Sequence, residues 1–317
     1  MEQEKRKIEL YKTRTFSQKI SDTFEFVTEN WKPLLKFSTY LLLPLAMLMA
    51  VCMTNMMDGY SVMITDSGSM SDDRLISTFV SYGGVLILGI IFGIVCASLI
   101  YACMRLYAER EQRLQGLTGS ELKPRLLHGM KRMGILTAIG FVLAVILIAA
   151  VVFLSITVGK LSGVAIVLVM ALLIIATPVV LVPFSLTAPI YLFEDETSAF
   201  AAIGKAWRLG FATWGGTFAV LFILGMLAYM AGGALSLPYV IVTMTKILAN
   251  ANELASMQSN TNVLTSMLQY LLAVFTYFTS YLLMSVVYIG LAYQYGHASD
   301  KIDGTGTNRE IEQFDTL

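Results

Sequence analysis

Residues 133–159 read MGILTAIGFVLAVILIAAVVFLSITVG, an unbroken apolar stretch between Arg132 and Lys160. None of its 27 residues is charged. A helix of about 20 apolar residues is long enough to cross the hydrocarbon core of a bilayer. This stretch therefore predicts a membrane-spanning helix.

Five more charge-free stretches occur along the chain. They contain 21 residues after Lys36, 30 after Arg74, 33 after Lys160, 37 after Arg208 and 46 after Glu253. Each is long enough to span a bilayer. The sequence predicts an all-α polytopic membrane protein with six spans, near 34–57, 76–105, 134–158, 164–192, 210–234 and 264–294.

The composition agrees with this class. Of the 317 residues, 56% are hydrophobic and 14% are charged, whereas about 25% is usual in soluble domains. The 22 basic residues balance the 22 acidic ones, so no nucleic-acid partner is indicated. The three cysteines, Cys52, Cys96 and Cys103, all lie in apolar runs, and we interpret them as packing residues. We expect no metal and no cofactor.

The distribution of Lys and Arg predicts the orientation. The arm through Lys36 has eight, the 105–133 loop seven, the 194–208 loop two and the tail two, while the intervening segments hold only three. The positive-inside rule then places both termini in the cytoplasm. We expect a multi-pass protein of the bacterial inner membrane, with membrane lipids as its surroundings.

Three short amphipathic segments precede outward spans. Thr15 and Gln18 form a capping box, and the helix predicted after it has one apolar face and one polar face. The apolar face is Phe16, Ile20, Phe24, Val27 and Trp31, and the polar face is Lys19, Asp22, Glu25 and Glu29. The other two segments have the apolar faces Leu122, Leu126, Met130 and Met133, and Phe200, Ile203 and Trp207. Such helices lie in the headgroup layer, and Trp31 and Trp207 are their expected interfacial anchors.

The chain then consists of three repeats of an interfacial helix, an outward span and a return span, at about 16–108, 120–193 and 197–295. Residues 1–15 form a polar arm, 16–297 a single membrane domain, and 298–317 a cytoplasmic tail expected to be disordered. After Pro238, the apolar face of 240–254 indicates either a helix on the outer leaflet or a continuation of the fifth span.

The stretch VVLVPFSLTAPIYLFE at 179–194, then SAFAAIGKAWRL at 198–209 and a new span, resembles the membrane domain of glycerophosphodiester phosphodiesterases and of related stand-alone bacterial membrane proteins. The close resemblance covers about 178–225. Ala206 stands where that family usually has serine. The resemblance implies a membrane module without catalytic residues, because the family's hydrolase activity belongs to a separate soluble barrel, for which this chain offers no segment.

No catalytic residue is predicted in the spans. Intramembrane catalysis needs a nucleophile with a base or clustered ionisable groups, and these are costly in lipid. The six expected cores contain no charged residue and no histidine. We interpret His128 and His297 as headgroup-facing residues and expect that the protein is not an enzyme.

Polar residues in the fourth and sixth spans are candidates for a cavity lining. Pro178, Pro183 and Pro189 interrupt the fourth span, either as simple kinks or as a break that lines a cavity. The candidate lining residues are Thr177, Ser185, Thr187, Gln269, Tyr277, Tyr281 and Tyr288. A hydroxyl-rich stripe of this kind also serves helix packing.

Small residues at four-residue spacing allow close approach of helices in lipid. They are Gly89, Gly93 and Ala97 in the second span, and Ala228 and Gly232 in the fifth. We expect them to pack spans within the chain.

Two functions remain. One is a non-enzymatic membrane scaffold or accessory subunit, with another membrane or cytoplasmic protein as its partner. The other is a carrier or lipid-handling protein for an apolar or lipid-like substrate, with a cavity between spans four and six.

The orientation can be tested by cysteine labelling. We expect an impermeant thiol reagent applied to intact cells to modify Ser67→Cys and to leave Ser120→Cys unmodified, because the first lies in the predicted outer loop and the second in a cytoplasmic loop. The unsubstituted chain controls for the native cysteines. Labelling at Ser120→Cys alone would overturn the orientation.

Overall fold

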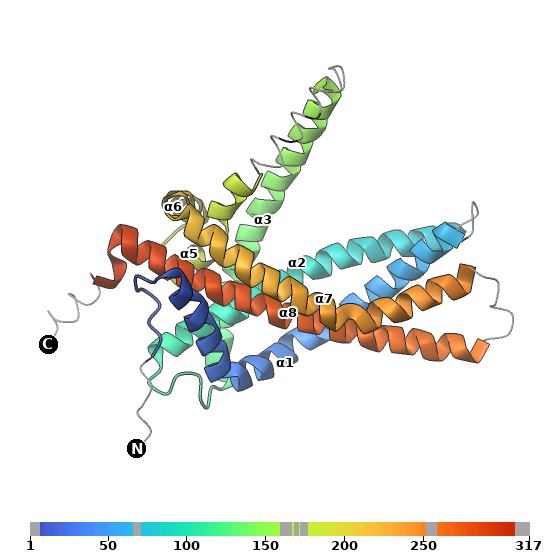
Figure 1. Ribbon diagram of the computed structural model, residues 1–317, viewed down its shortest axis with the longest axis horizontal. Helices are drawn as coiled ribbons and strands as arrows, with labels where there is room; N and C mark the ends of the chain where they lie inside the picture. The colour runs from blue at the N-terminus through green and yellow to red at the C-terminus, as the bar shows by residue number, and fades with distance from the viewer. Residues whose placement is uncertain are drawn as a thin grey trace. The chain divides into compact units, whose positions relative to one another are not determined.

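The computed structural model describes residues 7–65, 71–158, 177–251 and 259–307, together with Val167 and Ala171. Within these residues the chain is helical and contains no strand. Figure 1 labels the helices in chain order. They are α1 (Phe16–Thr65), α2 (Asp72–Glu109), α3 (Gly119–Val158), α5 (Thr187–Phe193), α6 (Ala199–Ala212), α7 (Trp214–Ala251) and α8 (Ser259–Asp303).

Five of the described helices are long and apolar enough to cross a membrane. They are Phe16–Tyr60, Asp72–Glu109, Gly119–Phe153, Trp214–Leu248 and Val263–Asp303. The five include the expected first, second, third, fifth and sixth spans. Most of 164–176, the beginning of the expected fourth span, lies outside the described residues, and its end is the shorter apolar segment Thr177–Phe193.

The chain forms two compact units, which are described separately. Unit 1 comprises 1–30, 97–224 and 287–317, and unit 2 comprises 31–96 and 225–286. Unit 1 has an aromatic centre in which the ring of Phe26 meets Tyr107 at 5.0 Å and Tyr293 at 6.5 Å, both edge-on. Unit 2 packs Ala50, Tyr239 and Ala273 together, and its Phe92 and Tyr281 rings stack.

The first amphipathic segment begins at the predicted capping box. Thr15 N donates to Gln18 Oε1 at 2.9 Å, and Gln18 N donates to Thr15 Oγ1 at 3.4 Å. The backbone leaves helical geometry at Asn30, where φ is −114° and ψ is 17°. Pro33 explains this departure, because its ring has no N–H and clashes with the carbonyl one turn earlier.

The segment 16–30 turns its polar face into unit 1. Lys19 is buried, Asp22 accepts a 2.7 Å bond from Arg14 Nε, and Glu29 accepts from Arg113 and Tyr107. Its large apolar side chains Phe16 and Phe24 remain exposed. In water this polarity would be inverted, whereas a helix lying at a bilayer surface meets lipid with its apolar face.

The other two amphipathic segments differ from each other. Residues 120–133 lie within the single helix α3, and Leu122 and Leu126 are buried in unit 1. This corrects the expectation of an interfacial helix for these two residues, because both pack against protein and not against lipid. Helix α6 begins at Ser198, whose hydroxyl accepts from Ala201 N, and its Phe200 and Trp207 are exposed as expected.

A turn separates residues 177–184 from α5. The chain turns at 185–186, where Ser185 N donates to Val182 O and Leu186 N to Pro183 O. Pro189 accounts for the interruption, because it cannot donate to the carbonyl of residue 185 and its ring clashes there. The prolines of the fourth span therefore break the helix close to the end of the span.

Helices α7 and α8 both continue beyond the bounds of the expected fifth and sixth spans, and for α7 this is one of the two alternatives that the sequence left open. Helix α7 continues through Pro238, so 240–251 extends the fifth candidate span as one helix. Helix α8 continues to Asp303, and 305–307 are also helical. The tail was expected to be disordered from residue 298, and that expectation is wrong for 298–303.

Contacts with the N-terminal arm explain why residues 298–303 are helical. Thr13 Oγ1 donates to Asp300 Oδ2 at 2.8 Å, and Arg14 N donates to His297 Nδ1 at 3.0 Å. A side chain at Gly296 would lie 1.9 Å from Leu10 O, so only glycine allows the arm this close. The arm buries His297, which corrects its interpretation as a headgroup-facing residue.

Both expected anchors can be tested by substitution. Trp207 packs on Phe184 and Phe211, with ring centroids at 5.3 and 4.3 Å, and Trp31 is exposed beside Lys32. We expect Trp31→Glu and Trp207→Glu each to destabilise the detergent-solubilised protein by roughly 1–2 kcal/mol and to reduce membrane yield, because an acid replaces an aromatic anchor.

The Phe variants at both positions are the matched controls and should melt close to the wild type, since they keep the ring. Glu variants with wild-type melting temperature and yield would show that neither indole anchors its helix.

Candidate functional site

A polar pocket of about 370 Å³ lies in unit 1, where the charge-free part of α2 ends and α3 begins. We call it the basic pocket because two arginines and a histidine line it. Its lining is Ser98, Tyr101, Ala102, Arg105, Pro124, Arg125, His128, Gly129, Leu192 and Asp195.

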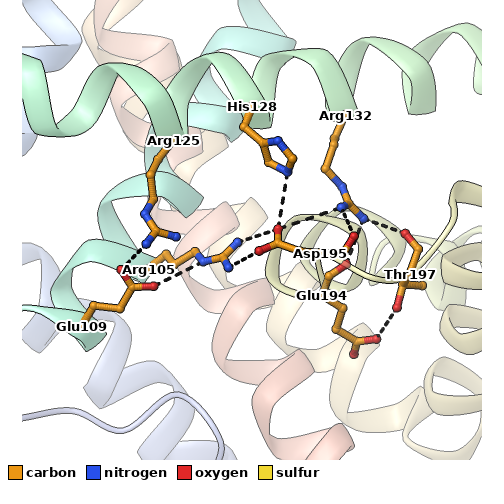
Figure 2. A network of polar contacts seen from close by, with 8 residues as sticks. All are labelled: Arg105, Glu109, Arg125, His128, Arg132, Glu194, Asp195 and Thr197. Atoms are coloured by element: carbon orange, nitrogen blue, oxygen red, sulfur yellow. Dashed lines mark hydrogen bonds and ion pairs between the residues drawn. The ribbon is translucent and has the colours of Figure 1, made fainter.

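Asp195 is the acidic residue that Arg105, His128 and Arg132 approach (Figure 2). Arg105 donates to both of its carboxylate oxygens, with Nη1 2.8 Å from Oδ1. His128 Nε2 lies 3.4 Å from Oδ1, and Arg132 Nη1 lies 3.9 Å away. The Arg105 guanidinium holds the pKa of Asp195 below its usual value, so Asp195 is ionised at neutral pH.

Arg132 fixes the loop that carries Asp195. It donates to three backbone carbonyls that follow α5, those of Asp195 at 2.6 Å, Glu194 at 2.9 Å and Thr197 at 2.7 Å. Its guanidinium also stacks 4.0 Å from the centre of the Tyr191 ring. Carbonyls at the end of a helix lack intrahelical donors, and a buried guanidinium satisfies them.

Glu194 points away from the pocket and binds other elements of unit 1. Its carboxylate accepts from Lys205 Nζ at 2.6 Å, from Tyr295 Oη at 2.5 Å and from Thr197 Oγ1 at 2.9 Å. Burial acts to raise the pKa of Glu194, but these donors outweigh it and lower the pKa. Neighbouring acids thus hold α6 and α8 on one side and α2 on the other.

The second arginine of the pocket, Arg125, is held by a more exposed ion pair than Arg105. Arg125 Nη2 donates to Glu109 Oε2 at 2.5 Å, and Arg105 Nε lies 3.5 Å from Glu109 Oε1. The side chains of Arg125 and Glu109 are 34% and 44% exposed. An exposed pair of this kind contributes little to stability, so Arg125 can exchange its partner at small cost.

The inner wall is formed where α2 and α3 approach closely. A side chain on Gly129 would come 3.3 Å from Ser98 Cβ. Ser98 is 1% exposed, and its Oγ has no hydrogen-bond partner among the described residues. Serine, histidine and aspartate thus share one pocket, but His128 meets Asp195 through Nε2 and the hydroxyl of Ser98 is not bonded to it. This arrangement is not that of an activated nucleophile.

A second hollow, of about 840 Å³, lies in unit 2 between α7 and α8. We call it the α7–α8 groove. Its lining combines small residues, two hydroxyls and larger apolar side chains: Gly225, Ala228, Tyr229, Met230, Gly232, Gly233, Ala234, Ser236, Leu237, Thr276, Ser280 and Met284.

The candidate cavity residues from the sequence line neither of these two hollows. In unit 1, Ser185 Oγ donates to Val182 O, Thr187 is buried and Tyr288 meets the Tyr101 ring, while Thr177 is the first described residue of its segment. In unit 2, Gln269 bonds Lys246 and Thr243, Tyr277 packs on the Tyr239 cluster and Tyr281 stacks on Phe92.

The expected packing glycines differ among themselves. A side chain at Gly89 would meet Met49 at 3.7 Å, and one at Gly232 would meet Leu283 at 3.7 Å. At Gly93 a side chain would meet nothing within 4 Å among the described residues, so no close approach to them requires that glycine. Ala97 is fully buried, whereas Ala228 and Gly232 line the α7–α8 groove.

Sequence reasoning selected none of the following charged residues as part of a site: Arg105, Arg125, Arg132 and Asp195. A signal was present, because Glu194 and Asp195 directly follow an apolar run and the 105–133 loop holds seven basic residues. Their pairing spans 63 positions between Arg132 and Asp195 and follows from tertiary structure.

Searches against models of known families, against curated proteins and against solved structures find no match. Among the residues that the structure describes, no group of three or more His, Cys, Asp or Glu is placed to hold a metal ion.

The role of Arg132 predicts a stability effect. We expect Arg132→Gln to destabilise the solubilised protein by roughly 3 kcal/mol, because three carbonyls lose the charged donor that the buried guanidinium supplies. Lys131→Gln is the matched control, since Lys131 is exposed and carries the same charge. Equal melting temperatures for the two variants would show that Arg132 does not hold the loop.

Proposed function

We propose that this chain is a non-enzymatic multi-pass membrane protein that serves as a scaffold or accessory subunit. Unit 1 would form a platform at the cytoplasmic face of a bacterial inner membrane. The observation that carries this proposal is the use of the charged groups in unit 1. Arg105, Arg132 and Glu194 each bind groups of this same chain, which holds separate elements in one arrangement.

Placement at the membrane surface is supported by two features. Five described helices are long and apolar enough to span a bilayer, and Lys and Arg gather in the segments that form unit 1. The segment 16–30 also exposes Phe16 and Phe24 while burying Lys19. We propose six spans and both termini in the cytoplasm.

A non-enzymatic role is supported by the chemistry of the basic pocket. Asp195 accepts from Arg105 and lies beside His128, and the hydroxyl of Ser98 is not bonded to the histidine. We propose further that the chain is related to the membrane domain of glycerophosphodiester phosphodiesterases, on the strength of residues 178–225. In that family the hydrolase belongs to a separate barrel.

The α7–α8 groove favours a second candidate, a carrier or lipid-handling protein. Gly225, Ala228 and Gly232 leave space on one side, and Thr276 and Ser280 add hydroxyls to an apolar lining. A lipid-like molecule matches that combination of apolar surface and few polar groups.

The two candidates can be separated by photo-crosslinking in cells. We expect a photoreactive residue at exposed Lys131, on unit 1, to form one discrete adduct with another protein, and the same residue at exposed Asp73 to form none. A scaffold presents a cytoplasmic surface to its partner, whereas a carrier does not require one.

Mass spectrometry of the protein purified in mild detergent shows whether a protein partner is retained. A retained protein partner supports the scaffold. No protein adduct, together with movement of fluorescent lipid between vesicles that depends on the purified chain, would overturn the scaffold in favour of the carrier. Hydrolysis of a glycerophosphodiester would contradict both.

A further inference from the structure

We propose that the basic pocket binds the phosphodiester headgroup of an anionic membrane lipid. The proposal rests on the placement of unit 1 at the bilayer surface given above, and it adds a ligand to that unit. The groups that bind the headgroup are Arg105, Arg125 and His128.

Asp195 shows that Arg105 and His128 converge on a single negative charge, whereas Arg125 is bonded to Glu109 beside them. Arg105 binds the Asp195 carboxylate through two nitrogens, and His128 and Arg132 approach the same oxygen, Oδ1. A phosphodiester carries one negative charge spread over two oxygens, as a carboxylate does, and guanidinium groups bind both in the same forked geometry. Asp195 therefore occupies the place of the anion and competes with it.

Arg125 and His128 provide the entry to the site. Both side chains are partly exposed, 34% for Arg125 and 54% for His128. The contact of Arg125 is with Glu109 on the surface, through Nη2. An incoming phosphate can replace this exposed pair without leaving a buried charge unpaired.

The inner wall points to a lipid rather than to free phosphate. Beside the cations the pocket has the apolar surfaces of Ala102, Leu192 and Tyr101, and its buried Ser98 hydroxyl lacks a partner among the described residues. Free phosphate has no apolar part that could contact this wall, whereas the glycerol and first acyl carbons of a lipid can pack against it. The volume of about 370 Å³ lies in the usual range for small-molecule sites.

The position along the helices places the pocket at headgroup depth. Arg105 is the first charged residue after 30 uncharged ones on the α2 side, and Arg132 is the last before 27 uncharged ones on α3. Basic pockets where spanning helices leave the hydrocarbon are suited to anionic headgroups.

The test uses the full chain, purified in a mild neutral detergent and depleted of lipid. Dihexanoyl phosphatidylglycerol, dihexanoyl phosphatidylcholine and inorganic phosphate are titrated separately, and binding is measured by native mass spectrometry and by the shift in melting temperature. We expect phosphatidylglycerol to bind more tightly than either of the other two probes, because only this probe combines net negative charge with an apolar part.

The variants assign the site. We expect Arg125→Gln to weaken phosphatidylglycerol binding by about tenfold, because a charged hydrogen bond is lost. Lys123→Gln should change binding by less than about threefold, since it removes the same charge from an exposed position two residues away. Asp195→Asn should strengthen binding several-fold, because it removes the competing carboxylate.

The outcomes separate the alternatives. Equal affinity for Arg125→Gln and Lys123→Gln would overturn the site, and equal binding of inorganic phosphate would overturn the lipid as its ligand. If Arg125→Gln fails to fold, His128→Gln replaces it, because His128 is exposed. A protein that retains its crosslinked partner but binds no phosphatidylglycerol refutes this inference alone, whereas loss of the partner adduct bears on the proposed function.

Discussion

A charged side chain cannot be left without partners at the edge of a bilayer, because water reaches it poorly there and an uncompensated buried charge costs several kcal/mol. In unit 1 the buried side chains of Arg14 and Arg132 bond to groups of the same chain. Arg132 is buried, and three carbonyls and an aromatic ring surround its guanidinium. The same interaction positions the short loop between α5 and α6. The loop in turn presents Asp195 to Arg105.

The loop that Arg132 holds places a carboxylate inside the basic pocket. A pocket with arginines alone would bind anions without discrimination. Here the carboxylate of Asp195 already occupies the guanidinium of Arg105. Any external anion competes with Asp195, so affinity is moderated and the loop between α5 and α6 becomes sensitive to occupancy. Binding of the proposed ligand would therefore be linked to the arrangement of α2 and α3 through Asp195, which contacts Arg105 and His128.

The terminal segments follow the same logic. Arg14 is 4% exposed, bonds to Asp22 at 2.7 Å and lies over the Tyr293 ring. Burial of this charge requires the arm to lie against the end of α8, where Arg14 N also meets His297. An arm and a tail that look polar and mobile in the sequence are consequently ordered through residues 10–14 and 296–303, because each supplies the hydrogen bonds that the other lacks.

The sequence by itself determined the helical class and the apolar segments, because a backbone that enters lipid must satisfy its hydrogen bonds within each segment and about 20 uncharged residues reveal such a helix. The capping box at Thr15 and Gln18 was equally local and is confirmed. Only the tertiary structure decided that Leu122 and Leu126 face protein and that His297 is buried. The same holds for the pairing of Arg105 with Asp195, which lie 90 positions apart. Hydrophobic periodicity shows which residues share a helix face, but it contains no information on what that face meets, since lipid and a protein core are equally apolar.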